Sequence, residues 1–204
     1  MIYTVTLNPA LDKTVQIPSF RLGEVNRISA MRTDPGGKGI NVSKVLRELG
    51  EPSVAAAILG GAAGRKIESA LRALGIEGLY LFTGHETRTN LKIVDPTLHT
   101  NTDVNEPGVP ADEAVLSKLL SQLTGRLRPG DLVVLSGKAP AGAPDTLYRD
   151  WILACRAAGA AVYLDAEGEL LRQGVTAGPA LIKPNQAELS GVMGRPLRSE
   201  EHTS

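Results

Sequence analysis

The sequence predicts an α/β protein in which a parallel β-sheet is flanked by helices and accompanied by a small extra β segment. Short β-branched or apolar runs, typical of buried strands, alternate with stretches whose apolar residues recur every three or four positions, as in helices. Glycine follows several of the helical stretches, where it can end a helix. This alternation favours a parallel sheet, because neighbouring parallel strands need a crossover connection that is usually a helix.

The first half of the chain supplies two strands and two helices to this pattern. Residues 2–8 (IYTVTLN) and 53–60 (SVAAAILG) are short apolar runs that predict buried strands. Between them lies a helical pattern that stops at Gly50 and is formed by Val42, Val45, Leu46 and Leu49. A second helical pattern stops at Gly75 and is formed by Ile67, Leu71 and Leu74.

The second half continues the same alternation. Three more buried strands are predicted, at 131–137 (DLVVLSG), 160–166 (AAVYLDA) and 180–185 (ALIKPN). Leucines spaced as in a helix precede the first of these strands, at 116–123, and a helical pattern at 147–158 precedes the second. A short helix is expected between the second and third strands.

Two segments, roughly 13–33 and 88–106, do not fit this alternation. The second begins with RTNLKIVD, in which Arg88, Asn90 and Lys92 share one face and apolar residues occupy most of the other. That pattern predicts a half-exposed strand with a cationic polar face. We interpret both segments as a flap, or lid, over the carboxyl ends of the main strands, where ligands bind in open α/β sheets.

Composition excludes several classes of function. The 204-residue chain has 22 Lys plus Arg, 22 Asp plus Glu and 3% aromatic residues, whereas a nucleic-acid-binding protein is expected to be basic or to offer aromatic stacking surfaces. No run approaches the ~18 apolar residues of a membrane span, and the first residues do not resemble a signal peptide. The single cysteine, Cys155, is expected to be a small buried hydrophobe. We therefore expect a cytoplasmic protein that binds neither nucleic acid nor membranes.

The segment DPGGKGINVSKVLRELG, residues 34–50, places glycines and a lysine directly before a helix, an arrangement suited to binding an anion. It is not a nucleotide-phosphate loop of a known type. Gly39 follows Lys38 where a P-loop needs Ser or Thr, and the third glycine of the dinucleotide fingerprint is missing. We interpret it as a loop that a ligand approaches closely, with Lys38 and Asn41 facing that ligand. A plain tight turn is the alternative.

Other polar residues extend this predicted ligand site. Asp12 follows the first strand in NPALD, and its carboxylate can accept hydrogen bonds from sugar hydroxyls. Lys38 and Arg88 together can grip a dianionic phosphate, the arginine as a fork and the lysine as a point charge. For Arg88 and its neighbours the alternative is a solvated strand face.

Six motifs occur along the chain in the order TLNPALDKTV, GGKGINVSKVL, RTNLKIVDP, NEPG, LVVLSG and LIKPNQAEL. Together they resemble the phosphofructokinase-B group of ribokinase-like sugar kinases, and within it the subgroup of 1-phosphofructokinase and tagatose-6-phosphate kinase. The resemblance covers residues 1–197 and implies a ribokinase-like parallel sheet with a small β lid. It also implies a kinase that uses MgATP to phosphorylate a sugar phosphate. Fructose 1-phosphate, giving fructose 1,6-bisphosphate, is the first expectation and tagatose 6-phosphate the alternative.

The resemblance also implies roles for individual residues. The glycine loop is expected to belong to the sugar site, with hydroxyls held by Asp12, Gly37 and Asn41, and the sugar's phosphate held by Lys38 and Arg88. Ser136, in the LSG motif, is expected in the same site. The ATP phosphates are expected near Lys183, Asn185 and Glu188, of which Asn185 and Glu188 form an N-x-x-E element that acts indirectly on Mg²⁺. In the full-length form, the lid is expected to pair with the lid of a second subunit and form a homodimer.

The chain departs from the resembled pattern in three ways. Lys138 replaces a small residue in LSGKAP, where it either adds a phosphate contact or is solvated. No GAGD-type turn occurs in residues 140–204, and the resemblance places the general base and the anion hole in such a turn. We therefore expect no catalytic residue in this chain, a base located beyond Ser204, a missing C-terminal part of the fold, and an inactive fragment. Residues 198–204 (RSEEHTS) resemble one reading frame of a sequencing adapter and are predicted to be a non-native tail.

Two other functions remain open at this point. A nicotinamide-dependent oxidoreductase would use the same α/β fold class, although the glycine spacing argues against it. A non-catalytic half-domain that keeps the sugar-phosphate site would fit the missing GAGD-type turn.

Overall fold

The computed structural model describes residues 1–110 and 112–195. Two expectations fall outside these residues and stay predictions: the non-native tail at 198–204, and the position of the catalytic base beyond Ser204, the last residue of that tail. The main sheet has six strands in the order β10-β9-β8-β1-β4-β5, and all the neighbouring strands run parallel. The strands are β1 (Ile2–Thr6), β4 (Ser53–Gly60), β5 (Glu77–Thr83), β8 (Leu132–Ser136), β9 (Ala161–Asp165) and β10 (Leu181–Ile182). The predicted parallel α/β sheet is therefore confirmed.

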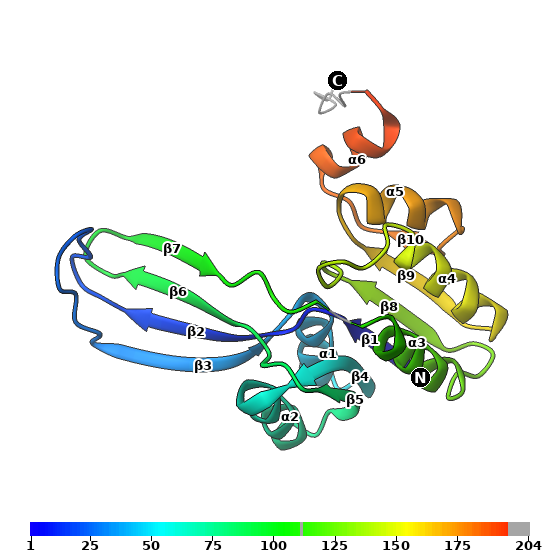
Figure 1. Ribbon diagram of the computed structural model, residues 1–204, viewed down its shortest axis with the longest axis horizontal. Coiled ribbons are helices and arrows are strands. Elements are labelled where there is room, and N and C mark those ends of the chain that lie inside the picture. The colour runs from blue at the N-terminus through cyan, green and yellow to red at the C-terminus, as the bar shows by residue number, and fades with distance from the viewer. Residues whose placement is uncertain (111, 196–204) are drawn as a thin grey trace.

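Helices cover both faces of this sheet (Figure 1). One face packs against α1 (Lys38–Glu48) and α2 (Gly61–Ala73) through a core that includes Ile40, Ile67 and Leu71. The other face packs against α3 (Glu113–Thr124), α4 (Leu147–Ala157) and α5 (Gly168–Thr176) through the larger core, which includes Leu119, Trp151 and Leu171. α6 (Gln186–Met193) follows β10. Within the described part of the chain no helix is long and apolar enough to cross a membrane.

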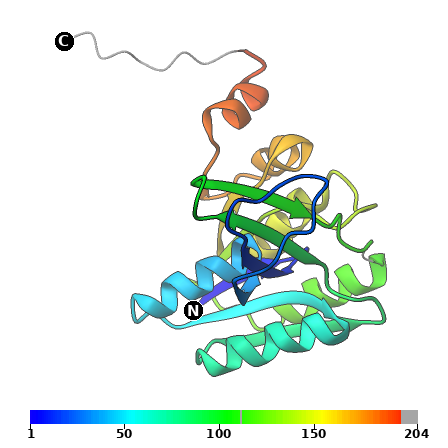
Figure 2. The ribbon, with the colours of Figure 1, turned by 90° about the vertical axis from the view of Figure 1, so that its left-hand side faces the viewer.

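A second sheet of four strands, here called the projecting sheet, extends away from this body. Its order is β3-β2-β6-β7, and it is built from β2 (Ala10–Gln16), β3 (Ala30–Gly36), β6 (Thr89–Asp95) and β7 (Thr100–Asn105). β2 pairs antiparallel with β3 and parallel with β6, and β6 pairs antiparallel with β7. In Figure 2 this sheet lies in front of the main body. Val15, Ile17 and Ile93 form a small core of its own.

The projecting sheet reaches further into the chain than the segments 13–33 and 88–106. β2 begins at Ala10 and β3 ends at Gly36, and these two residues are paired in register. Asp12 therefore lies inside a strand of the projecting sheet and does not simply follow the end of a main-sheet strand. The glycine loop begins inside β3 for the same reason, so it is a junction between this strand and α1.

One strand of the main sheet was not predicted. β5 pairs with β4 at the edge of the sheet. Its residues EGLYLFT include a charged residue and a glycine, and their burial does not alternate regularly. An edge strand has a neighbour on one side only, so it needs less continuous apolar sequence than a central strand such as β4, every residue of which is buried.

Candidate functional site

Most of the predicted substrate residues surround one cavity, between the projecting sheet and the carboxyl ends of β1 and β8. This cavity, here called the junction cavity, has a volume of about 350 Å³. It is lined by Gly37, Lys38, Asn41, Arg88 and Ser136, together with Asn90 of β6 and others. The six residues named here come from three separate stretches of sequence, so the fold has brought them to the edge of the sheet where open α/β proteins bind ligands.

Asp12 lines an adjoining cavity of about 520 Å³ that shares Asn41 and Asn90 with the junction cavity. The amide nitrogen of Asn90 donates a hydrogen bond to Oδ1 of Asp12 at 2.9 Å. Gly36 leaves the room for this arrangement, because a Cβ atom there would lie 2.0 Å from Oδ2 of Asp12. The carboxylate and two amide side chains form a set of hydrogen-bonding groups suited to sugar hydroxyls.

The glycine loop brings the first turn of α1 close to β1. Gly37 adopts φ +119°, a conformation that favours glycine, and a Cβ atom there would lie 2.5 Å from Cγ2 of Thr6. A Cβ atom at Gly39 would lie 2.5 Å from both Oγ1 of Thr6 and the carbonyl oxygen of Val5. The backbone N–H of Ile40 donates to Oγ1 of Thr6 at 2.9 Å. The start of α1, with Lys38 and Asn41, is thereby fixed at the wall of the cavity.

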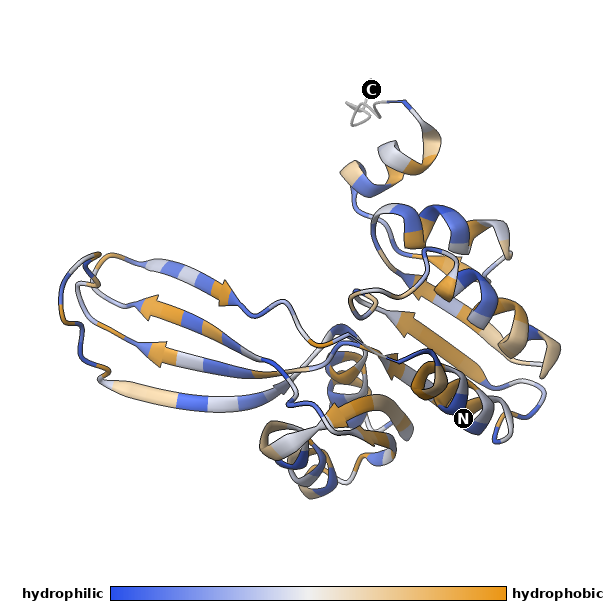
Figure 3. Cartoon of the chain, in the orientation of Figure 1, coloured by the Kyte–Doolittle hydropathy of each residue, from blue (hydrophilic) through white to orange (hydrophobic). Residues whose placement is uncertain are grey.

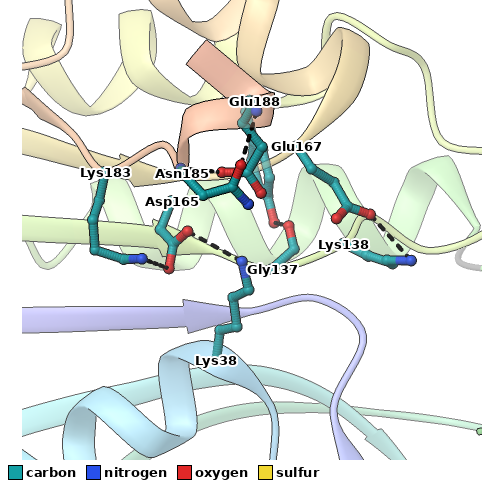
Figure 4. Close-up of polar contacts among 9 residues, drawn as sticks. Lys38, Gly137, Lys138, Asp165, Glu167, Lys183, Asn185 and Glu188 are labelled. Carbon is teal, nitrogen blue, oxygen red and sulfur yellow. Dashed lines mark hydrogen bonds and ion pairs between the residues drawn. The ribbon is translucent and has the colours of Figure 1, made fainter. Parts of the chain in front are cut away.

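Lys38 and Lys183 share one carboxylate. Nζ of Lys38 lies 3.1 Å from Oδ1 of Asp165, and Nζ of Lys183 lies 3.4 Å from Oδ2 of the same residue. Figure 4 shows the two lysines approaching Asp165 from opposite sides. Asp165 ends β9, and its side chain is 18% exposed. A residue assigned to the sugar site and one assigned to the ATP site thus meet at a single acidic group.

Arg88 is held by the backbone. Its guanidinium group donates to the carbonyl oxygens of Asn8 at 3.1 Å, Pro9 at 3.4 Å and Glu106 at 3.1 Å. The preceding residue, Thr87, exchanges two hydrogen bonds with Gly60 at the end of β4. A guanidinium group has more N–H donors than these three contacts use, so donors remain for a ligand in the cavity. Arg88 and Lys38 line the same cavity but are each engaged with other protein groups.

The turn after β8 contributes a hydroxyl and a rigid backbone. Ser136 is 1% exposed, and its Oγ has no hydrogen-bond partner among the described residues. The N–H of Gly137 donates to the carbonyl oxygen of Asp165 at 2.9 Å, and the hydroxyl of Tyr148 donates to the carbonyl oxygen of Gly137 at 3.0 Å. Burial, with a smaller effect of the Asp165 charge, raises the pKa of Tyr148. Tyr148 therefore stays a hydrogen-bond donor at neutral pH.

Asn185 and Glu188 form a capping box at the start of α6. The N–H of Glu188 donates to Oδ1 of Asn185, and the N–H of Asn185 donates to Oε2 of Glu188, both at 2.8 Å. The N-x-x-E spacing thus has a structural use in this chain. Figure 4 shows this capping box together with Asp165 and its two lysines. No group of three or more His, Cys, Asp or Glu side chains that could hold a metal ion occurs in residues 1–110 and 112–195.

Comparison with known proteins decides the family. Residues 5–204 match the model of a protein family described as "pfkB family carbohydrate kinase". The chain belongs to the pfkB family. This confirms the resemblance seen in the sequence motifs, and it contradicts the alternative of a nicotinamide-dependent oxidoreductase.

Individual pfkB relatives agree with this membership. A 1-phosphofructokinase of Xanthomonas campestris is 39% identical over 198 residues, which are 95% of this chain and 62% of that protein. A tagatose-6-phosphate kinase of Staphylococcus epidermidis is 34% identical over 195 residues, again 95% of this chain and 62% of that protein. The solved structure of phosphofructokinase-2 from Escherichia coli in complex with fructose-6-phosphate has a TM-score of 0.93 at 30% identity, covering 98% of this chain and 66% of that one. The chain therefore spans about 62% of the length of these two curated relatives.

Two acidic residues of this pfkB chain were missed as site residues by the sequence reasoning. Asp165 and Glu167 follow one another closely at the end of β9, and each pairs with a lysine near the junction cavity. A usable signal was present, because an acidic residue directly after a buried strand lies at the carboxyl edge of a parallel sheet. The sequence alone did not show which lysines these acids would meet.

Proposed function

We propose that this chain is the acceptor-binding part of an ATP-dependent sugar-phosphate kinase that converts fructose 1-phosphate into fructose 1,6-bisphosphate. The observation that carries the proposal is the junction cavity, which gathers Gly37, Lys38, Asn41, Arg88 and Ser136 around one space. The naming of its relatives as 1-phosphofructokinases supports the choice of reaction. Tagatose 6-phosphate is the second acceptor, supported by the tagatose-6-phosphate kinase relative.

The chemistry of the two cavities fits an acceptor with both hydroxyls and a phosphate. Asp12, Asn41 and Asn90 offer acceptors and donors for sugar hydroxyls. Lys38 and Arg88 supply positive charge on the neighbouring wall, where a phosphate dianion can accept charge-assisted hydrogen bonds. The site therefore favours a phosphorylated sugar over a free one.

The phosphates of ATP are proposed to lie on the other side of Lys38, near Lys183, Asn185 and Glu188. Lys38 and Lys183 are partly exposed and share Asp165, so an arriving phosphate can replace this carboxylate as their counter-charge. Mg²⁺ usually keeps several waters and is held by one or two carboxylates plus substrate phosphates. Oxygen atoms of Asn185, Glu188 and Asp165 fit such an indirect site, in which the metal would neutralise phosphate charge.

A non-catalytic sugar-phosphate-binding protein is the second candidate. It rests on the same junction cavity, whose residues are proposed to bind a sugar phosphate and none of which is proposed as a general base. Such a protein would bind the sugar phosphate with the same residues and transfer no phosphoryl group.

The projecting sheet is proposed to pair with that of a second copy and form a homodimer in the cytoplasm. Exposed apolar residues occur in β3 and in the connection between β2 and β3, among them Met31 at 57%, Leu22 at 90% and Val25 at 84%. Figure 3 shows hydrophobic stretches along this sheet. Its two edge strands, β3 and β7, each have a neighbour on one side only within the described residues. Exposed apolar groups and open strand edges of this kind favour association.

Isothermal titration calorimetry with the 204-residue chain tests the acceptor site. Fructose 1-phosphate is expected to bind more tightly than tagatose 6-phosphate, and both more tightly than fructose or ribose. Sedimentation velocity on the same sample tests the dimer. A preference for an unphosphorylated sugar would contradict the assignment of the junction cavity to a sugar phosphate.

A further inference from the structure

Lys138 stands where the resembled pattern has a small residue, and the structure places its side chain at the proposed acceptor site. It lines the junction cavity together with Lys38, Arg88 and Ser136. Its Nζ lies 3.0 Å from Oε1 of Glu167 (Figure 4). We propose that Lys138 is a specificity-determining residue that binds the phosphate of the sugar-phosphate acceptor, and that Glu167 holds it when no ligand is bound. This inference rests on the proposed function.

The backbone fixes the position from which Lys138 reaches the cavity. Gly137 adopts φ +94°, and hydrogen bonds to Asp165 and from Tyr148 hold both of its peptide groups. Tyr148 is fully buried, so this anchor is part of the protein core. Lys138 is therefore attached to a rigid turn, and only its flexible side chain needs to move when a ligand arrives.

The partner of Lys138 holds it weakly. The side chains of Lys138 and Glu167 are 69% and 47% exposed, and ion pairs this exposed to water contribute little to stability. A dianionic phosphate offers more negative charge and more acceptor oxygens than one carboxylate. Lys138 can therefore leave Glu167 for a phosphate at small cost, and Glu167 keeps the cation near the cavity until then.

Ser136 gives an independent indication that a ligand belongs beside Lys138. Its Oγ is buried without a hydrogen-bond partner among the described residues. Ser136 precedes Lys138 by two positions, and both residues line the junction cavity. A buried hydroxyl without a partner is costly, and a ligand oxygen would remove that cost. A hydroxyl donor next to an ammonium group is a suitable pair for a phosphate.

The location of Lys138 favours the acceptor's phosphate over those of ATP. Arg88, Asn41 and Asn90, which belong to the proposed sugar site, line the cavity with Lys138. None of the described residues proposed for the ATP side, Lys183, Asn185 and Glu188, lines it. The phosphate already present on the sugar is therefore the group that Lys138 would meet.

Titration calorimetry on the 204-residue chain tests this with the variants Lys138→Ser and Glu167→Gln and the control Lys118→Ser. Lys118 is an exposed lysine on α3, outside the junction cavity. Fructose 1-phosphate and unphosphorylated fructose are titrated into each protein. We expect Lys138→Ser to weaken binding of fructose 1-phosphate about tenfold, a loss in the lower part of the range for a charge-assisted contact. Its binding of fructose, and both affinities of the control, should stay within twofold of the original chain.

The Glu167→Gln variant tests the holding role. It is expected to bind fructose 1-phosphate as tightly as the original chain or up to about threefold more tightly, because the weakly paired competing carboxylate is gone. Weaker binding in this variant would contradict a competing role for Glu167.

The outcomes separate this inference from the proposed function. If the original chain binds fructose 1-phosphate and Lys138→Ser binds it equally well, the role of Lys138 is wrong and the acceptor site stands. If Lys138→Ser loses fructose and fructose 1-phosphate equally, Lys138 acts on the shape of the turn and not on the phosphate. If the original chain binds no sugar phosphate, the proposed function fails and this inference fails with it.

Discussion

Replacing Arg88 with alanine and, in a second variant, with lysine separates two roles that we assign to one side chain. The guanidinium group connects the segment after β1, at Asn8 and Pro9, with the segment after β7, at Glu106. It also lines the junction cavity, where the phosphate of the acceptor is proposed to bind. Arg88→Ala removes both sets of contacts, whereas Arg88→Lys keeps the charge and loses the planar fork.

The loss of stability follows from the hydrogen bonds. Two of the three contacts are 3.1 Å long and the third is 3.4 Å, so two of them count fully. At about 0.5–1.5 kcal/mol each, they predict that Arg88→Ala lowers the free energy of unfolding by about 1–3 kcal/mol. Arg88 is half-buried, which favours the lower part of this range. A typical domain stability of about 5–15 kcal/mol leaves the variant folded.

Arg88→Ala is expected to weaken the binding of fructose 1-phosphate more than the binding of ATP. A charge-assisted hydrogen bond contributes about 1.5–3 kcal/mol, so Arg88→Ala should weaken fructose 1-phosphate binding roughly tenfold to hundredfold. Binding of ATP should change less than threefold, because the proposed ATP residues lie on the far side of Lys38. Arg88→Lys should recover part of the sugar-phosphate affinity and little of the stability.

Urea unfolding and titration calorimetry measure the two effects on the same preparations. Arg72→Ala is the matched control, because Arg72 is an exposed arginine whose Nη2 pairs with Glu68 at 3.1 Å on α2. This control is expected to stay within about 0.5 kcal/mol of the original chain. An Arg88→Ala variant that loses ATP affinity in place of sugar-phosphate affinity would refute the placement of the two ligands. Full recovery of stability by Arg88→Lys would refute the bridging role of the fork.

Three further predictions concern the projecting sheet, the sugar site and turnover. Burial alone would raise the pKa of Asp95, but the N–H groups of Leu98, Phe20, Ser19 and Thr97 outweigh it and hold the pKa below the ordinary value of 3.8. The stabilisation by ionised Asp95 is complete above pH 3.8 and is lost as the pH falls through the lowered pKa of the folded state. The urea midpoint of the original chain should therefore fall between pH 5 and pH 3, and Asp95→Asn should make this fall less steep. An unchanged slope in the variant would disprove this role of Asp95. Gly36→Ala should move the Asp12 carboxylate and weaken sugar-phosphate binding about tenfold, the loss of roughly one hydrogen bond, while the thermal midpoint stays nearly constant; equal affinity by calorimetry would count against it. With fructose 1-phosphate and MgATP, the 204-residue chain should release no ADP above a no-enzyme control. Loss of an acid-base group alone lowers the reaction rate about 10²–10⁴-fold. A rate within tenfold of a full-length relative would show that the chain supplies its own base.

The main sheet was predictable because β1, β4, β8 and β9 each read as a short apolar run packed against helices on at least one face. β4 is buried throughout, whereas the burial of β9 alternates and its Tyr163 is 36% exposed. The glycines after the helices mark where the chain turns back. β5 was missed because an edge strand tolerates Glu77 and Gly78. The exact extent of β2 and β3 was also not predictable, because the pairing of Ala10 with Gly36 joins two segments that are far apart in the sequence.

Several residues that line the candidate cavities were named from the sequence, but their contacts, and the acids Asp165 and Glu167, were not. Glycine spacing and the polar face at 88–92 pointed to the cavity wall, since local patterns show which residues face outward. The partners of these residues are long-range: Lys38 meets an acid 127 positions away, and Arg88 contacts a carbonyl 80 positions away. Asn185 and Glu188 are a different case, because the family resemblance implied a functional element there and the structure shows that both residues form a helix cap.

The pairing of lysines with acids explains how a cavity with several cations stays intact before a ligand enters. Lys38 and Lys183 share Asp165, and Lys138 pairs with Glu167, so mutual repulsion among the cations is offset by nearby carboxylates. All three lysines are at least partly exposed, and exposed pairs of this kind are weak. A dianionic phosphate can therefore exchange places with a carboxylate while each cation keeps a counter-charge. By this argument, Lys38, Lys138 and Lys183, which pair with carboxylates around the junction cavity, are the groups proposed to bind the phosphates of the ligands.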